Sequence, residues 1–270
     1  MRHVLLYAAL AISAGAAQAQ WLNYVPAGTP LTADGKPNLS APTPKDPYGR
    51  PDLSGVWHQQ RTPGGAGQPR VESYANNLFR ETKPEDVPET ELGKKVRLQR
   101  VPPGVKNTEP PDATSSLCLP MGIPATNFVN EVIKIIQSRG ITMILYEVDG
   151  TYRQIYTDGR KLPEDPTPAW LGYSTGRWDG DTFVVETIGF NDKTWLDSAG
   201  HSHSDALHLT ERYRRRDFGH MDIEMTFNDP KMYTRPFSIK FTDELQPATD
   251  ILETYCNENE KDRTHYVGVK

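Results

Sequence analysis

Short segments with alternating apolar and polar residues make up most of the second half of the chain. Every second residue from 221 to 227 is apolar, and residues 237, 239 and 241 repeat the pattern. A period of two places the apolar side chains on one face of a strand and the polar side chains on the other. These segments therefore predict β-strands with one buried and one solvated face.

About ten segments of this kind follow one another, separated by short Gly and Asp turns. They cover residues 51–57, 132–137, 141–148, 152–157, 170–178, 182–188, 207–215, 220–227, 237–243 and 251–255. Because no long amphipathic helix separates them, the series predicts an antiparallel meander. We expect an all-β fold, a lipocalin-like up-and-down β-barrel that closes its own edges and holds one small ligand. A two-sheet sandwich is the alternative.

The first part of the chain has a different composition. Residues 1–19 combine a basic start, an apolar run and an Ala17-Gln18-Ala19 ending, which predicts a secretory signal peptide. The apolar run is shorter than the ~20 residues of a bilayer span, so we expect no membrane span and a periplasmic or secreted protein. Residues 20–114 are rich in Pro, Gly and charge, which predicts an irregular N-terminal arm with the first strand and one short helix at 85–98. This arm wraps on a barrel formed by residues 115–270.

Charge and cysteine content narrow the function further. The chain carries 30 Lys and Arg against 35 Asp and Glu, so we expect no nucleic-acid partner. Its two cysteines, Cys118 and Cys256, form an even count in a chain expected to reach an oxidising compartment. We therefore predict a Cys118–Cys256 disulfide, with two separate buried thiols as the alternative.

Several motifs carry a resemblance. PDLSGVW, CLPMGIP, IYTDGR, WLGYSTGRWDGDT, TERYRRRDFGH and CNENEKD follow one another from about Asp52 to the C-terminus. This set resembles a largely uncharacterised family of exported bacterial proteins. The resemblance implies a shared fold, and it implies no particular activity for this chain. Separately, Gly55-x-Trp57 resembles the lipocalin Gly-x-Trp signature and agrees with the barrel.

The densest group of ionisable residues lies between Gly200 and Arg212, which holds three of the seven histidines. If the strand at 207–213 extends backwards, the alternation puts these residues on one inward face: His201, His203, Asp205 and Glu211. Glu211 is then a carboxylate inside the barrel and His203 stands at its mouth, an arrangement that suits general acid–base catalysis. In the alternative, His203 caps a turn and Glu211 forms a core ion pair with Arg153 or Arg160.

Two further groups contribute candidate residues. Asp158 and Arg160 follow Tyr156 at a strand end, so Asp158 is a candidate base and Arg160 a candidate ligand of an anionic or carbonyl oxygen; the alternative is a simple Asp-Gly turn. The long connection 189–197 predicts a binding loop. Its Phe190 and Trp195 are candidates to cover an apolar ligand, and Asp192 and Asp197 to bind polar groups. Three further residues, Tyr156, His201 and Asp205, are substrate-binding candidates, as is Tyr173 in the strand segment 170–178.

Three functions are open at this point. The first is an exported, cofactor-free lyase, isomerase or hydrolase acting on a small hydrophobic or aromatic compound, with catalytic residues His203, Asp158, Glu211 and Arg160. The second is a lipocalin-like carrier without chemistry. The third is a metal-dependent hydrolase that holds zinc at His201 and His203, with the oligomeric state open in each case. Motifs of serine hydrolases, zincins and nucleotide-binding folds are absent from the sequence.

Overall fold

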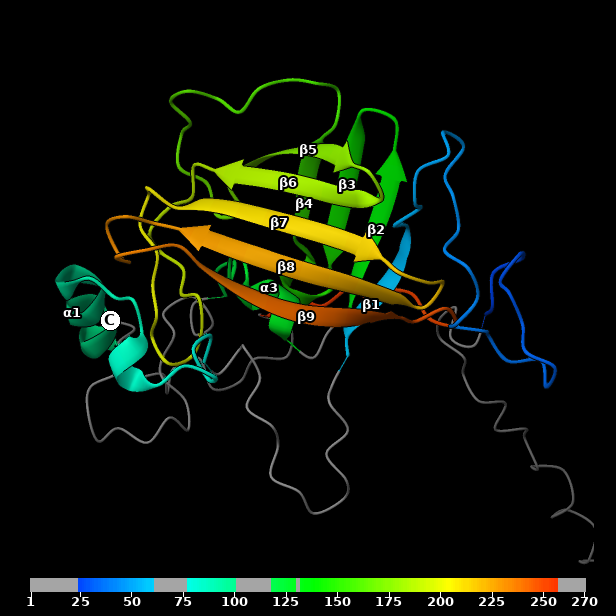
Figure 1. The fold of residues 1–270 in the computed structure, drawn as a ribbon, viewed down its shortest axis with the longest axis horizontal. Coiled ribbons are helices and arrows are strands. Elements are labelled where there is room, and N and C mark those ends of the chain that lie inside the picture. The colour runs from blue at the N-terminus through cyan, green and yellow to red at the C-terminus, as the bar shows by residue number, and fades with distance from the viewer. Residues whose placement is uncertain (1–23, 61–76, 101–117, 130–131, 257–270) are drawn as a thin grey trace, which may run out of the picture.

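The structure is a computed structural model that describes residues 24–60, 77–100, 118–129 and 132–256. Nine strands form one closed barrel in chain order, β1 to β9, and β9 pairs with β1 (Figure 1). The expected all-β barrel is confirmed, and the sandwich is excluded because the sheet closes on itself. The strands are β1 (Gly55–Gln59), β2 (Ile133–Ser138), β3 (Ile141–Tyr146), β4 (Tyr152–Tyr156), β5 (Tyr173–Asp179), β6 (Thr182–Ile188), β7 (His208–Arg215), β8 (His220–Asn228) and β9 (Phe237–Leu245).

One neighbouring pair departs from the expected antiparallel meander. β4 and β5 are parallel, while all other neighbouring strands in the barrel are antiparallel. The Pro-rich connection 157–172 causes this, because it crosses from one end of the barrel to the other before β5 begins (Figure 1). It is anchored by a bridge between Ala169 and Phe190.

The barrel has two unlike ends. Its turn end carries the tight β2–β3, β5–β6 and β7–β8 turns, and its loop end carries the longer connections 189–207 and 229–236. Short helical segments lie outside the wall or at its rim: α1 (Glu91–Arg100), α3 (Ala125–Phe128), η1 (Pro84–Asp86) and η2 (Val148–Gly150). α1 lies beside the loop end (Figure 1), where Thr90 donates to the Lys231 carbonyl just before the helix begins.

Three sequence expectations about elements need correction. The helix begins at Glu91 and ends at Arg100, later than the predicted 85–98, with only a short η1 turn before it. Residues 251–255 form no strand, because β9 already closes the sheet against β1. β7 begins at His208, so residues 201–207 belong to a loop rather than to a backward extension of the strand.

Large apolar side chains fill the barrel. The alternation read from the sequence puts them inside: among others Trp57, Ile135, Ile144, Ile155, Phe183, Val185, Leu209, Met225, Phe227 and Ile239. From α3, Phe128 reaches into this core and meets Phe241 edge-on at 5.1 Å. Burial of such side chains stabilises the fold by about 1.5–3 kcal/mol each.

Arg215 closes the turn end. Its guanidinium lies 4.8 Å from the ring centroid of Trp57 and donates to the backbone carbonyls of Asp52 and Phe218. Burial lowers the pKa of Arg215 to about 10. Arg215, from the basic run of β7, therefore packs on Trp57 of the Gly-x-Trp segment and covers the turn end of the barrel core.

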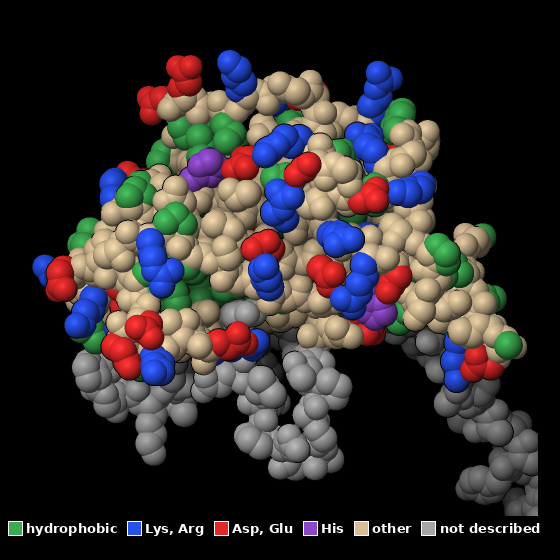
Figure 2. Space-filling view, viewed as in Figure 1, with side chains coloured by type: hydrophobic (Ala, Val, Ile, Leu, Met, Phe, Trp, Pro, Cys, Tyr) green, Lys and Arg blue, Asp and Glu red, His purple; other side chains and the backbone are tan. Residues whose placement is uncertain are grey.

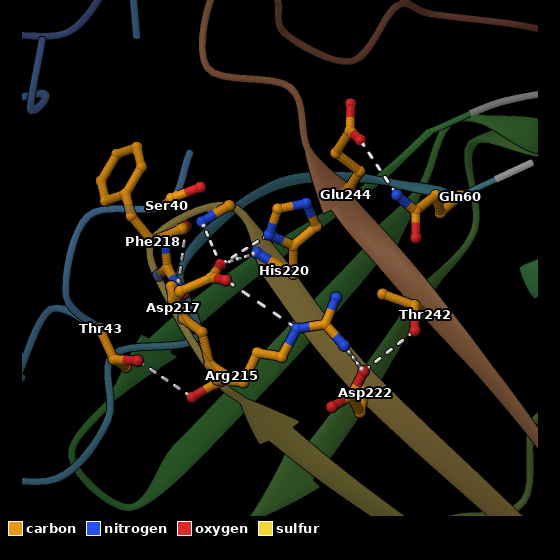
Figure 3. Close-up of polar contacts among 12 residues, drawn as sticks. Ser40, Thr43, Gln60, Arg215, Asp217, Phe218, His220, Asp222, Thr242 and Glu244 are labelled. Carbon is orange, nitrogen blue, oxygen red and sulfur yellow. Dashed lines mark hydrogen bonds and ion pairs between the residues drawn. The ribbon is translucent and has the colours of Figure 1, made fainter. Parts of the chain in front are cut away.

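Asp217 organises the adjoining β7–β8 turn (Figure 3). Its carboxylate accepts from the amides of Gly219 and His220 at 3.0 and 2.8 Å, and from His220 Nδ1 at 2.7 Å. The arm is tied to the same turn, because the Gly219 amide donates to the Leu39 carbonyl at 2.7 Å. The Asp-Phe-Gly-His motif is thus a turn that holds the arm.

A disulfide joins Cys118 to Cys256, as predicted, with their Cα atoms 5.4 Å apart. The expected signal peptide at 1–19 lies outside the described residues. None of the described helices has the length and apolarity needed to cross a membrane. On the face drawn in Figure 2, basic and acidic side chains are intermixed over the barrel wall.

Candidate functional site

The loop end gathers the His-rich stretch singled out in the sequence. The connection 189–207 folds over this end of the barrel, and its central residues are buried from Thr194 to Asp197 and from Gly200 to Ser204. An antiparallel bridge between Trp195 and Ser202 makes the connection fold back on itself. The two buried histidines of the loop, His201 and His203, have different surroundings.

His203 has both ring nitrogens occupied. Nδ1 lies 3.1 Å from the Ser204 carbonyl oxygen, which only accepts, so Nδ1 carries the proton. Nε2 then accepts from the Thr194 hydroxyl at 2.7 Å. Burial lowers the pKa of His203, which keeps the ring neutral. In this arrangement no lone pair of His203 is left for a substrate proton.

His201 forms a carboxylate–imidazole pair with Asp197. Nδ1 donates to Asp197 Oδ2 at 2.6 Å, and the His201 amide donates to Oδ1 at 3.1 Å. The Leu78 amide also donates to Asp197 Oδ2, at 2.7 Å, so the carboxylate is held from three directions. Among the residues that the structure describes, none hydrogen-bonds to His201 Nε2. The pair therefore fixes the tautomer and leaves the Nε2 lone pair available.

A cluster of aromatic rings contacts this pair through Phe79. Phe79 meets the His201 ring edge-on with centroids 4.8 Å apart, and Phe79 in turn lies 4.6 Å from Phe237 and 6.0 Å from Tyr233. Burial raises the pKa of Tyr233 well above its ordinary value, so its neutral hydroxyl donates to the Ser202 carbonyl at 2.9 Å. The His201 imidazole is therefore buried beside an aromatic cluster formed by Phe79, Tyr233 and Phe237, which is called the aromatic wall below.

Two polar groups lie close to the same loop. The Ser202 hydroxyl is buried and has no hydrogen-bond partner among the described residues. The Arg100 guanidinium at the end of α1 lies 5.0 Å from the Trp195 ring centroid and donates to the Thr194 carbonyl at 3.4 Å. The loop end therefore carries an imidazole, a buried hydroxyl and a guanidinium.

Glu211 lies in the barrel core, and its partner is Arg153. The guanidinium donates through both terminal nitrogens to the two carboxylate oxygens, with Nη1 at 3.0 Å from Oε1, and Tyr213 donates to Oε1 at 2.7 Å. Although burial by itself lowers the pKa of Arg153, the charge and the hydrogen bonds of Glu211 raise the pKa of Arg153 above its ordinary value. The ion-pair interpretation of Glu211 is the one observed, with Arg153 rather than Arg160 as the partner.

The group at Tyr156 lies at the opposite end from His203. The Arg160 side chain donates to both carboxylate oxygens of Asp158 and lies 3.6 Å over the Tyr156 ring centroid. Hydrogen bonds from Arg160 lower the pKa of Asp158. Because β4 ends at the turn end, the structure separates Asp158 and Arg160 from His203 and does not join the four expected catalytic residues.

The remaining candidates divide between interior and surface. Phe190 is buried and meets the His203 ring edge-on at 5.7 Å, and Trp195 is largely buried. Asp192 and Tyr173 are exposed. The inward orientation expected for Asp205 is wrong: it is exposed and pairs with Lys231 at 2.5 Å, because residues 205–206 turn the chain before β7.

The zinc alternative stays untested. Within the described residues, no group of three or more His, Cys, Asp or Glu side chains has an arrangement that would hold a metal ion.

Asp197 was expected only to bind polar groups, and the structure shows that it is the hydrogen-bond partner of His201. The sequence feature that could have indicated this pair is an Asp four residues before a His in a predicted binding loop.

Comparison with family models, curated proteins and solved structures yields no match to the chain.

Proposed function

We propose that this chain is an exported β-barrel enzyme that acts by cofactor-free acid–base chemistry on a small aromatic or hydrophobic compound at the loop end. The observation that carries the proposal is the Asp197–His201 pair, with its oriented Nδ1 proton and its available Nε2. Export is supported by the N-terminal segment and by the Cys118–Cys256 disulfide.

In this mechanism His201 is the catalytic base. Nε2 takes a proton from the substrate or from an attacking water, and Asp197 stabilises the resulting imidazolium through Nδ1. The same proton is returned to the leaving group or to a neighbouring carbon, so the enzyme ends in its starting state. Lyase, isomerase and hydrolase steps all fit this cycle.

The aromatic wall supports the substrate class. Phe79 lies against the imidazole, and Tyr233 and Phe237 pack around Phe79, which favours a flat or apolar substrate. Arg100, which contacts Trp195 and Thr194 of the loop, would stabilise a developing negative charge on a substrate oxygen. His203, with both nitrogens bonded, supports the loop that carries His201.

The chain offers a matched control. His208 is also paired with a carboxylate, Glu186 at 2.6 Å, but this pair lies on the outer wall, where 45% of the His208 side chain is exposed. His208→Ala therefore removes a carboxylate-paired histidine outside the proposed site, which makes it the control for His201→Ala.

The test uses the exported protein and a panel of aromatic esters, aromatic lactones and β-hydroxy carbonyl compounds. At least one compound is expected to be turned over by the wild type and by His208→Ala, and at least 100-fold more slowly by His201→Ala. Asp197→Asn is expected to fall between them. Unchanged turnover in His201→Ala, or no turnover of any compound by the wild type, would contradict the proposal. Retained binding of aromatic compounds without turnover would favour the carrier, whose supporting observation is the closed barrel itself.

A further inference from the structure

A concave site lies at the turn end, at the opposite end of the barrel from His201. A hollow of about 520 Å³ opens there, a volume in the range of small-molecule sites. Tyr48 and Arg50 of the N-terminal arm line one side, and Arg139, Gly140 and Thr157 line the other. The site thus forms only because the arm folds against the β2–β3 turn and the end of β4.

The arm side of the hollow is held in place by hydrogen bonds to the Asp46 carboxylate. Asp46 accepts from Arg50 Nε at 3.1 Å and from the Tyr48 amide at 2.8 Å. Gln137 at the end of β2 donates to the same carboxylate at 3.0 Å, which joins the arm to the barrel. Although burial opposes the charge, these hydrogen bonds lower the pKa of Asp46, so the carboxylate stays ionised and holds Arg50. The Arg50 guanidinium lies 5.2 Å from the Tyr48 ring centroid.

The barrel side contributes an uncompensated charge. Arg139 is exposed at the β2–β3 turn and has no ion-pair or hydrogen-bond partner among the described residues. The other cations near the hollow are balanced, Arg50 by Asp46 and Arg160 by Asp158. The Thr157 amide donates to the Gly140 carbonyl at 2.9 Å, which fixes the turn beside the strand end. The described residues therefore leave one positive charge at the hollow.

We propose that this hollow binds a small aromatic carboxylate. The Arg139 guanidinium matches the two oxygens of a carboxylate, and such charge-assisted, bidentate bonds are stronger than neutral ones. The Tyr48 ring, which is 57% exposed, supplies a flat apolar surface for the ring of the ligand. A single unbalanced arginine favours a monoanion over a phosphate ester with two charges.

This site is independent of the proposed catalytic pair. It lies at the turn end, whereas Asp197 and His201 belong to the connection at the loop end. The variant His201→Ala should therefore bind the turn-end ligand as the wild type does. Loss of turnover therefore tests the proposed chemistry, and loss of benzoate binding tests the turn-end site, so that one proposal can fail without the other.

The experiment titrates the full exported chain with benzoate and follows the amide signal of Gly140 by NMR. Benzoate is expected to bind the wild type at least tenfold more tightly than it binds Arg139→Gln. The control is Arg235→Gln, which removes another exposed arginine without a partner among the described residues and should bind as the wild type does. Tyr48→Ala should weaken benzoate about fivefold and leave inorganic phosphate unchanged.

Neutral benzamide tests the charge directly, because it has the same ring and no negative charge. It is expected to bind at least tenfold more weakly than benzoate. The proposal is overturned if Arg139→Gln binds benzoate as the wild type does, if benzamide binds equally well, or if inorganic phosphate binds as tightly as benzoate. All three variants change exposed side chains, and their far-ultraviolet circular dichroism should match that of the wild type.

Discussion

Arg153 on β4 and Glu211 on β7 face each other across the barrel core, with both side chains almost completely buried. The guanidinium also donates to Ser174 on β5 and Thr187 on β6, at 3.0 and 2.6 Å. One ion pair thus links four strands, including the parallel pair β4 and β5. Its hydrogen bonds satisfy charges that burial would otherwise make very costly.

Breaking this pair from one side should destabilise the protein severely. Glu211→Gln leaves Arg153 as an uncompensated buried cation, so we expect the free energy of unfolding to fall by roughly 3–5 kcal/mol. Chemical denaturation followed by tryptophan fluorescence measures the change.

Replacing both partners is the control for that prediction. In Arg153→Met with Glu211→Leu no buried charge is left unpaired, so the double variant should be more stable than Glu211→Gln. A double variant less stable than the single one would show that the strands depend on the ion pair itself.

Asp243 should make stability fall as the pH rises. It lies inside the barrel on β9, and burial raises the pKa of Asp243 to about 7. A carboxyl with a raised folded-state pKa favours folding most below its unfolded pKa of 3.8, and this contribution is lost as the pH rises to about 7. At 1.36 kcal/mol per pKa unit the loss is roughly 4 kcal/mol.

Asp243→Asn cannot ionise, so its stability relative to the wild type should increase between pH 4 and pH 8. Urea denaturation at several pH values measures the difference. Glu244→Gln, on the outward face of the same strand, is the control and should show little change. A pH-independent difference between Asp243→Asn and the wild type would exclude a buried ionisable carboxyl at this position.

His203 should have the opposite dependence. Burial lowers its pKa, so the folded protein holds the neutral ring while the unfolded chain binds a proton near pH 6.5. Stability should therefore fall as the pH drops below 6.5, because protonation removes the acceptor that Thr194 uses. Thermal unfolding from pH 7 to pH 5 should show this fall in the wild type. A smaller fall is expected in His203→Gln, and equal slopes would argue against a buried neutral imidazole.

The disulfide should stabilise the fold strongly. Cys118 and Cys256 are 138 positions apart, and the chain-entropy model assigns a loop of this size about 4–5 kcal/mol. Cys118→Ser with Cys256→Ser should lower the denaturation midpoint, and a reducing agent should do the same to the wild type. If the variant lost less than about 1 kcal/mol, the entropic account of this bridge would fail.

The alternation of side chains by itself predicted the nine strands of the all-β fold and put Glu211 inside, because a period of two is a local property of the chain. It favoured a closed barrel with a two-sheet sandwich as the alternative, and it wrongly added a strand at 251–255 and an inward Asp205. The even cysteine count of a chain expected to be exported predicted the bridge between Cys118 and Cys256. The parallel β4–β5 pair was not accessible in this way, since it depends on where the connection 157–172 crosses the barrel.

The tertiary structure alone decided which ionisable groups meet. Arg153 and Glu211 are 58 positions apart and pair only because β4 and β7 share the barrel interior. Asp158 and His203 looked like partners in the sequence, yet the barrel places them at opposite ends. Asp197 became the partner of His201, and Asp205 turned to the surface, because the chain bends before β7. Strand periodicity depends on residues that are close in sequence. A site is formed by residues that are far apart in sequence, and only the closed sheet determines which of them lie close together in space.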